Sequence, residues 1–166
     1  MNAEAIRLLY DYNYWASHRL LAAAGQCTAE QLDASLPMSW HSLLGTFAHI
    51  LGAEWAWRQR CQAGFSPTKL LDPAQFATLE ALRRRWGEEE TAMRAYANSL
   101  SDAGLQRVVE YQNTSGKPFR RVLWQILLHV VNHGTQHRGE AALYLTTFGH
   151  SPGDIDLSVY YAQQLG

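Results

Sequence analysis

Apolar side chains recur every three or four residues along four long stretches of the chain, which short polar segments separate. This spacing is the period of an α-helix that buries one face. The first stretch covers residues 3–24 and ends before Gly25. The second is predicted over about residues 40–62, with Ser39 as its N-cap and Gly64 after its last turn.

The third helix is predicted over about residues 73–99, with Asp72 as its cap. Pro73 then takes the first helical position, where its missing N–H costs nothing. The fourth helix covers about residues 120–148 and is closed by Gly149. Helices of this length, joined by short connections, are typical of a four-helix bundle.

Three shorter elements complete the prediction. Residues 28–32 indicate a single helical turn, and Asp154 is expected to cap a last short helix that ends near Gln164. In residues 107–120, β-branched and aromatic residues flank the turn sequence NTSG, which predicts a small hairpin or an extended loop. The predicted fold class is therefore all-α, in a single domain over residues 1–166.

Composition and charge narrow the function without naming it. The 166 residues are 47% hydrophobic and include six Trp, which suffices for one well-packed core. The net charge of −1 gives no basic surface of the kind that nucleic acids require. The densest basic run, residues 83–85, is followed by acidic residues 88–90, which is typical of an exposed helix carrying ion pairs.

Neither a membrane span nor a leader sequence is expected. No apolar run reaches the ~18 residues that a transmembrane helix needs, and the N-terminus lacks a signal-peptide pattern. Cys27 and Cys61 lack a CxxC spacing and are expected to be free thiols in a reducing compartment. We therefore expect a cytoplasmic protein.

Three histidines in the fourth predicted helix carry the strongest chemical signal. His129, His133 and His137 are spaced four residues apart, and each step turns only about 40° around a helix, so they share one stripe. Two histidines at this spacing can direct two imidazoles at one divalent metal. The pairs 129/133 and 133/137 satisfy the spacing equally well, and periodicity does not choose between them.

His49 is the best candidate for a further ligand. It lies near the middle of the second predicted helix, as His133 lies near the middle of the fourth, and mid-length positions of packed helices reach similar heights. The alternative interpretation is that each histidine is an ordinary hydrogen-bonded core residue. Burying several imidazoles without a shared role costs desolvation free energy, however, and a metal offsets that cost.

Three segments resemble a known family. They are YDYNYWASHRLL in the first helix, LLGTFAHILGAEWAW in the second, and NHGTQHRGEAALYLTTFGHSPGDIDLSVYY near the C-terminus. Over essentially the whole chain the sequence resembles the DinB-like family of DNA-damage-inducible helical proteins, which is distinct from the polymerase of the same name. The resemblance implies a four-helix bundle, often dimeric, with a divalent metal held by His49, His133 and His137. His129 is then left as a neighbouring residue.

Relatives in the wider superfamily include mycothiol-dependent maleylpyruvate isomerase and bacillithiol S-transferases. The resemblance therefore implies a metal-dependent enzyme that transfers a low-molecular-weight thiol to a small electrophile during stress or detoxification. The alternatives are a non-enzymatic metal- or ligand-binding stress protein and a metal-dependent hydrolase of small molecules. Gly134 stands where HExxH proteases carry their catalytic Glu, which disfavours peptide hydrolysis by that mechanism.

The donor set also predicts the metal and its surroundings. Three imidazoles leave at least one coordination position open, and they suit zinc first, with nickel, manganese or iron as alternatives. Glu54, one turn beyond His49, and residues 13–15 are candidates to line or support the site. Arg138 and Glu140 could support His137, or they could form structural ion pairs with a neighbouring helix or with the acidic residues 154 and 156.

Overall fold

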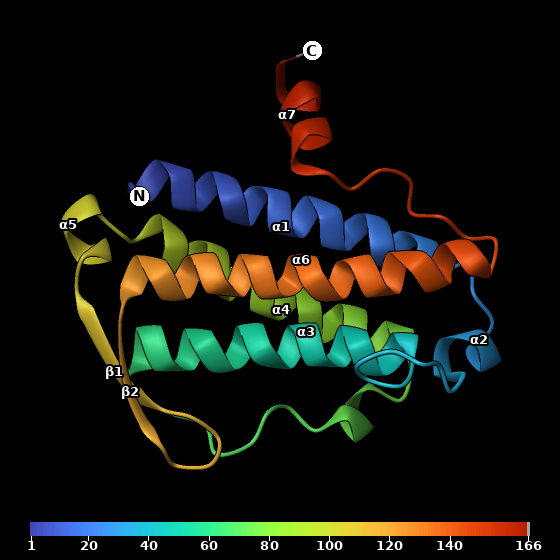
Figure 1. Cartoon of the computed structure of the whole chain (residues 1–166), viewed down its shortest axis with the longest axis horizontal. Helices are drawn as coiled ribbons and strands as arrows, with labels where there is room; N and C mark the ends of the chain where they lie inside the picture. The colour runs from blue at the N-terminus through green and yellow to red at the C-terminus, as the bar shows by residue number, and fades with distance from the viewer. Residues whose placement is uncertain (166) are drawn as a thin grey trace.

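Four long helices lie side by side and fill most of the molecule (Figure 1). The computed structural model describes residues 1–165, which are mostly helical, as the sequence predicts. Helix α1 packs against α4 and α6, and α3 packs against the same two helices. The four are α1 (Ala3–Ala24), α3 (Leu43–Arg58), α4 (Leu79–Asn98) and α6 (Leu123–Thr147).

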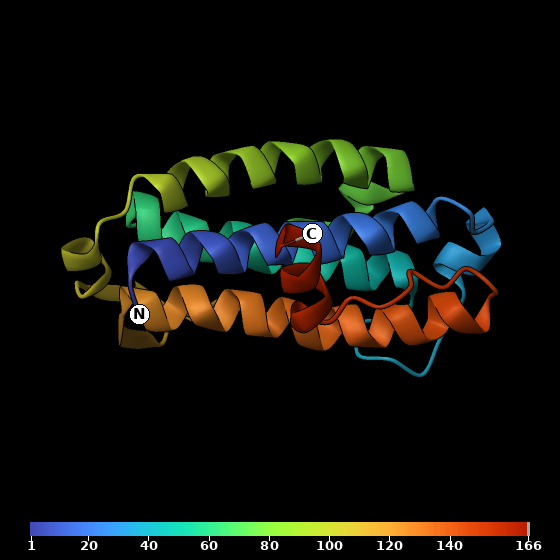
Figure 2. The same cartoon turned by 90° about the horizontal axis from the view of Figure 1, so that it is seen from above.

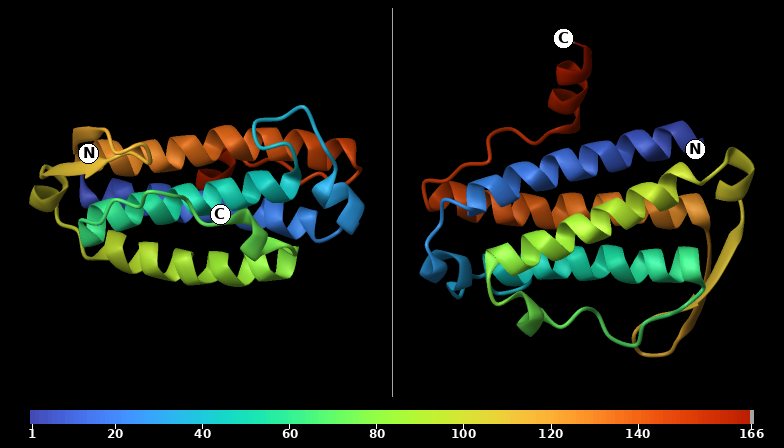
Figure 3. Two further views of the ribbon diagram at one scale, coloured as in Figure 1. Left: turned by 90° about the horizontal axis from the view of Figure 1, so that it is seen from below. Right: turned by 180° about the vertical axis from the view of Figure 1, so that it is seen from behind.

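Helices α1 and α6 run in one direction, and α3 and α4 run in the other (Figures 1 and 2). The link between α3 and α4 must therefore return along the length of the helices, and residues 64–78 make this crossover (Figure 3). Helix α2 (Ala29–Asp33) lies at one end of the molecule, and α5 (Asp102–Leu105) and the sheet lie at the other.

The predicted hairpin is confirmed. Strand β1 (Val108–Gln112) pairs antiparallel with β2 (Pro118–Val122). Between the strands, the Asn113 side chain accepts hydrogen bonds from two backbone N–H groups, and Gly116 supplies a positive φ of 80°. The strands also correct the predicted start of the fourth helix. Residues 120–122 pair with β1, so α6 begins only at Leu123.

Two predicted caps are wrong. Helix α3 begins at Leu43, and Ser42 rather than Ser39 caps it by accepting a hydrogen bond from the backbone N–H of residue 45. Helix α4 is capped by Thr78, because Pro73–Phe76 forms a separate 3-10 helix. Ser, Thr and Asp all make good caps, so the local sequence offers several starts and tertiary packing selects among them.

Two further helix boundaries, the end of the segment after α3 and the start of the last helix, compare differently with the predictions. Beyond α3, a π-helix, Gln59–Ala63, ends where Gly64 adopts a left-handed φ of 66°, so the predicted stop at that glycine is confirmed. The last helix, α7 (Leu157–Leu165), begins two residues later than a cap at Asp154 predicts. Asp154 does not cap it; its side chain accepts a hydrogen bond from the backbone N–H of Asp156 instead.

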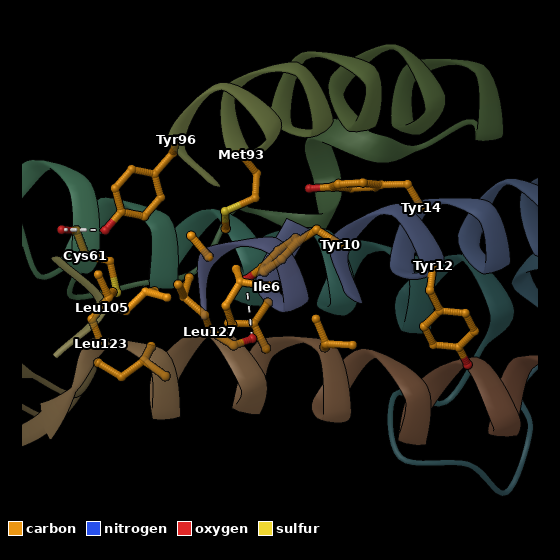
Figure 4. Close-up of a cluster of buried hydrophobic side chains, with 14 of the residues drawn as sticks. Ile6, Tyr10, Tyr12, Tyr14, Cys61, Met93, Tyr96, Leu105, Leu123 and Leu127 are labelled. Carbon is orange, nitrogen blue, oxygen red and sulfur yellow. Dashed lines mark hydrogen bonds between the residues drawn. The ribbon is translucent and has the colours of Figure 1, made fainter. Parts of the chain in front are cut away.

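Apolar side chains from α1, α4 and α6 meet in the core (Figure 4). Ile6 and Met93 are almost fully buried there, and the hydroxyl of Tyr10 donates to the backbone carbonyl of Leu127 at 3.4 Å. The predicted ion pairs on α4 are only partly exposed, because Glu89 is fully buried and binds Arg58 of α3. Among the described helices, none combines the length and apolar character needed to span a bilayer.

Candidate metal centre

The structure brings His49, His133 and His137 together between α3 and α6. One potential ligand atom from each residue lies within 4.8 Å of those of the other two. The Nε2 atoms of His49 and His133 are 3.0 Å apart, and the His137 ring centroid is 4.8 Å and 4.6 Å from the other two. His129 stays outside this cluster, with its ring centroid 5.8 Å from that of His133.

Helix packing explains this convergence. Helices α3 and α6 pack against each other in opposite directions, so the mid-length positions of His49 and His133 face each other, as the sequence analysis predicts. His137, one turn along α6, then lies on the same stripe. The sequence therefore places three histidines on one stripe of α6. The position of His49 on α3 determines that His133 and His137, rather than His129, lie closest to it.

Two of the imidazoles, those of His49 and His133, sit in surroundings that disfavour their charged forms. Burial, and after it the neighbouring histidines, lower the pKa of His49 to about 3 and that of His133 to about 4. The neutral rings keep lone pairs that a metal can use. In addition, Nδ1 of His49 is buried with no hydrogen-bond partner among the described residues.

These donors fit a divalent cation. Two nitrogens that each lie ~2.0–2.1 Å from a tetrahedral metal are ~3.3 Å apart, so the 3.0 Å separation of the two Nε2 atoms needs to open by only a few tenths of an ångström. The set is also purely nitrogen, without a thiolate or carboxylate in the cluster. The three-histidine cluster could therefore hold a metal ion, and its chemistry does not select one metal.

Glu140 orients His137. Its Oε2 atom lies 3.1 Å from Nδ1 of His137, and its Oε1 accepts a hydrogen bond from the Ser39 hydroxyl at 2.7 Å. Burial raises the pKa of Glu140, but the hydrogen bonds from Ser39 and His137 outweigh it and lower that pKa overall. A carboxylate on Nδ1 fixes the proton there, so the lone pair of Nε2 is free to face the cluster.

Trp40 is a part of the site that the sequence analysis missed. Its ring stacks on His49 with centroids 3.8 Å apart and an interplanar angle of 17°. The helical period placed this residue at the start of a helix, whereas residues 34–42 form a loop that precedes α3. Loops carry no periodic signal, so only the folded chain shows this contact.

Glu54 does not support His49, contrary to the prediction. It is buried and accepts hydrogen bonds from Asn13 at 3.1 Å and Tyr14 at 2.5 Å. Burial raises the pKa of Glu54 to about 7. The Asn13 side chain in turn accepts a hydrogen bond from Arg138, which is 1% exposed, so a polar network joins α3, α1 and α6. Arg138 therefore serves the core and makes no ion pair with residues 154 or 156.

Gly134 is required for this network. A Cβ at Gly134 would lie 2.8 Å from Nη1 of Arg138 and 3.1 Å from Oδ1 of Asn13. We expect Gly134→Ala to lower the free energy of unfolding by about 1–3 kcal/mol, because both atoms are held in place. Gly139→Ala is the matched control on α6: nothing lies within 4 Å of its Cβ, and it should stabilise by about 0.5–1 kcal/mol. Thermal unfolding measures both, and equal effects would contradict the prediction.

The metal-free protein is expected to lose stability as the pH falls from about 6.5 to about 4. In this interval His49 and His133 stay neutral in the folded chain, whereas histidines of ordinary pKa 6.5 take up protons in the unfolded chain, so acid favours unfolding. The measurement is the thermal midpoint against pH in the presence of EDTA. A His49→Gln, His133→Gln double variant should lose less over the same interval, and an unchanged slope would refute the assignment.

A cavity of about 460 Å³ adjoins the cluster on the α3 side. His49 itself and the Trp40 ring form part of its wall, and Leu70 and Leu71 of the crossover form another part. A small molecule that enters this cavity therefore reaches a histidine of the cluster directly. Its mixture of apolar walls and a few polar groups is typical of a small-molecule site.

A predominantly helical chain with three histidines converging from two long helices defines a class of potential metal-binding helical proteins. The chain belongs to the DinB family, whose family model matches residues 1–164. It is 25% identical to Protein DinB of Bacillus subtilis (strain 168) over 162 residues, which cover 92% of this chain and 91% of that protein. The resemblance stated from the sequence is thereby confirmed.

Proposed function

We propose that this protein is a metal-dependent enzyme that transfers a low-molecular-weight thiol to a small electrophile. The observation that carries the proposal is the cluster of His49, His133 and His137 beside an open cavity. Three nitrogen donors leave a coordination position for a substrate, which is the arrangement of catalytic rather than structural sites. A bound divalent metal would supply Lewis-acid activation of a thiol.

The thiol must come from outside the chain. Cys61 is buried, and burial raises the pKa of its thiol to about 12, so it stays protonated at neutral pH. Burial also raises the pKa of Cys27. Neither cysteine belongs to the histidine cluster. A free thiol cosubstrate is therefore the nucleophile that the proposal requires.

The nearby carboxylates favour thiol transfer over hydrolysis. Hydrolysis needs a general base for the attacking water. Glu140 is engaged with Ser39 and with Nδ1 of His137, and Glu54 is engaged with Asn13 and Tyr14. These two carboxylates thus hold other side chains in place. In the proposed enzyme, Glu140 keeps His137 oriented, and Trp40 keeps the His49 ring in its plane.

The proposal includes a scaffold and a metal. We propose that the four long helices form the four-helix bundle of this family, that the ligands are His49, His133 and His137, and that zinc is the native metal, with nickel, manganese or iron as alternatives. We further propose a cytoplasmic homodimer that acts in stress or detoxification.

The test combines metal analysis with a thiol panel. Protein purified without an affinity tag is assayed with glutathione, bacillithiol and mycothiol against a chromogenic aryl halide, before and after chelation. We expect one thiol to react faster with the loaded protein and the acceleration to disappear with EDTA. No metal-dependent acceleration with any thiol would refute the transferase. A tightly bound metal with a saturated, water-free coordination shell would instead support a non-enzymatic metal-binding protein.

A further inference from the structure

A second cavity lies on the other side of the histidines, where the hairpin meets α3 and α6. Its volume is about 340 Å³. It is separate from the cavity beside His49, since the two share no lining residue. Its walls are formed by Trp57, Tyr111, Arg121, Gln125, Ile126 and His129.

This second cavity is next to the proposed metal centre. His129 lines it, and the His129 ring centroid is 5.8 Å from that of His133. The Trp57 ring meets the other side of His129 edge-on, with centroids 5.4 Å apart. The cavity therefore adjoins a histidine that is itself in ring contact with the cluster.

Two arginines, one in the cavity wall and one behind it, bring positive charge to the cavity, and neither forms an ion pair within the part of the chain that the structure describes. Arg121, an exposed residue of β2, lines the cavity, and its guanidinium donates a hydrogen bond to the backbone carbonyl of Arg120. Arg60 is only 6% exposed, and its guanidinium lies 4.7 Å from the Trp57 ring centroid and 5.6 Å from that of Tyr111. None of the six lining residues is acidic.

Arg60 is a buried cation, and its burial costs desolvation free energy. Its Nε is buried without a hydrogen-bond partner, and among the described residues its guanidinium forms no ion pair. Contact with two aromatic faces offsets part of the desolvation cost of a buried cation, but it does not neutralise the charge. Arg60 does not line the cavity, but its charge lies against two of the rings that do, so it favours an anion there.

We propose that this cavity is a subsite for the carboxylate of a small, partly planar organic acid whose other end reaches the three-histidine cluster. The inference rests on the proposed function, because it assigns charge and shape to one of the two substrates. The guanidinium of Arg121 matches a carboxylate with two parallel N–H donors. The rings of Trp57 and Tyr111 offer apolar faces and edges to the planar part of the molecule.

Binding of 2-naphthoate and of its uncharged amide, 2-naphthamide, tests the subsite by calorimetry on metal-free protein. We expect the acid to bind about tenfold or more tightly than the amide, and Arg121→Gln to remove that difference. Arg120→Gln is the matched control, because this neighbour on β2 pairs with Glu110 and does not line the cavity. Equal binding of acid and amide, or equal losses in both variants, would overturn the proposal.

Steady-state kinetics of thiol transfer then show which of the two substrates carries the carboxylate. With the loaded enzyme, Arg121→Gln should raise the KM of either the thiol or the electrophile and change kcat little; if neither KM rises, the subsite is refuted. The calorimetry needs neither metal nor reaction. Intact selectivity for naphthoate without any thiol transfer would therefore remove the proposed transferase and leave the subsite standing.

Discussion

His133→Ala protein is expected to be purified without its divalent metal, with an affinity reduced at least about 100-fold. Even the loss of a residue that only orients a ligand costs about 10- to 100-fold, and His133 is proposed to be a direct ligand at the centre of the cluster. Its Nε2 atom lies 3.0 Å from Nε2 of His49, and its ring centroid lies 4.6 Å from that of His137. Elemental analysis of untagged protein and competition with a chelating dye measure the loss.

His129→Ala is the matched control for this experiment. It removes a histidine from the same face of α6, one turn earlier, but outside the cluster. We expect it to retain metal, whereas His49→Ala and His137→Ala should behave like His133→Ala. Release of metal from the His129 variant, together with retention in the His49 variant, would place the site on the 129/133 pair and contradict the assignment.

Asn13→Leu is expected to lower the free energy of unfolding by about 3–5 kcal/mol, which corresponds to a fall of about 10 °C in the thermal midpoint. Asn13 bridges two buried ionisable side chains, since its amide donates to Glu54 and its carbonyl oxygen accepts from Arg138. Leucine has a similar size but neither group, so Arg138 would lose an acceptor at a position where water does not replace it. Chemical and thermal denaturation measure the effect.

Ser17→Ala provides the comparison. Ser17 lies one turn along α1 and also contacts Arg138, but its hydroxyl is 3.5 Å from the guanidinium and it does not touch Glu54. Its loss should therefore cost only about 1 kcal/mol. If Asn13→Leu proves as mild as Ser17→Ala, the network contributes little, and the three helices are held by their apolar contacts alone.

The helical pattern located the site's histidines but not their surroundings. The four-residue spacing of His133 and His137 is a local property of α6, so the sequence carries it in full. The partner on α3 is 84 residues away from His133, and its position at the middle of a predicted helix and the family resemblance indicated it. Glu140 was one of two open candidates, and it is the contact with His137 in the folded chain that selects it.

The hydrogen bonds of Asn13 show why the sequence did not predict the other contacts around the site. Asn13 and Arg138 are 125 residues apart, and Ser39 and Glu140 are 101 residues apart. A polar residue on an apolar helix face can serve a metal, a core network or the solvent, and its own neighbours in sequence do not distinguish these roles. Glu54 was assigned to His49 by spacing, whereas the packing of α1 against α3 gives it to Asn13 and Tyr14.

The sequence by itself determined the long helices, the hairpin, the stop at Gly64 and the histidine stripe, because backbone geometry and helical period act over a few residues. The tertiary structure alone decided which serine caps α3, how Trp40 stacks on His49 and which carboxylate holds His137. These contacts form only when loops and helices distant in the chain pack together, and their energies depend on burial that no local segment possesses.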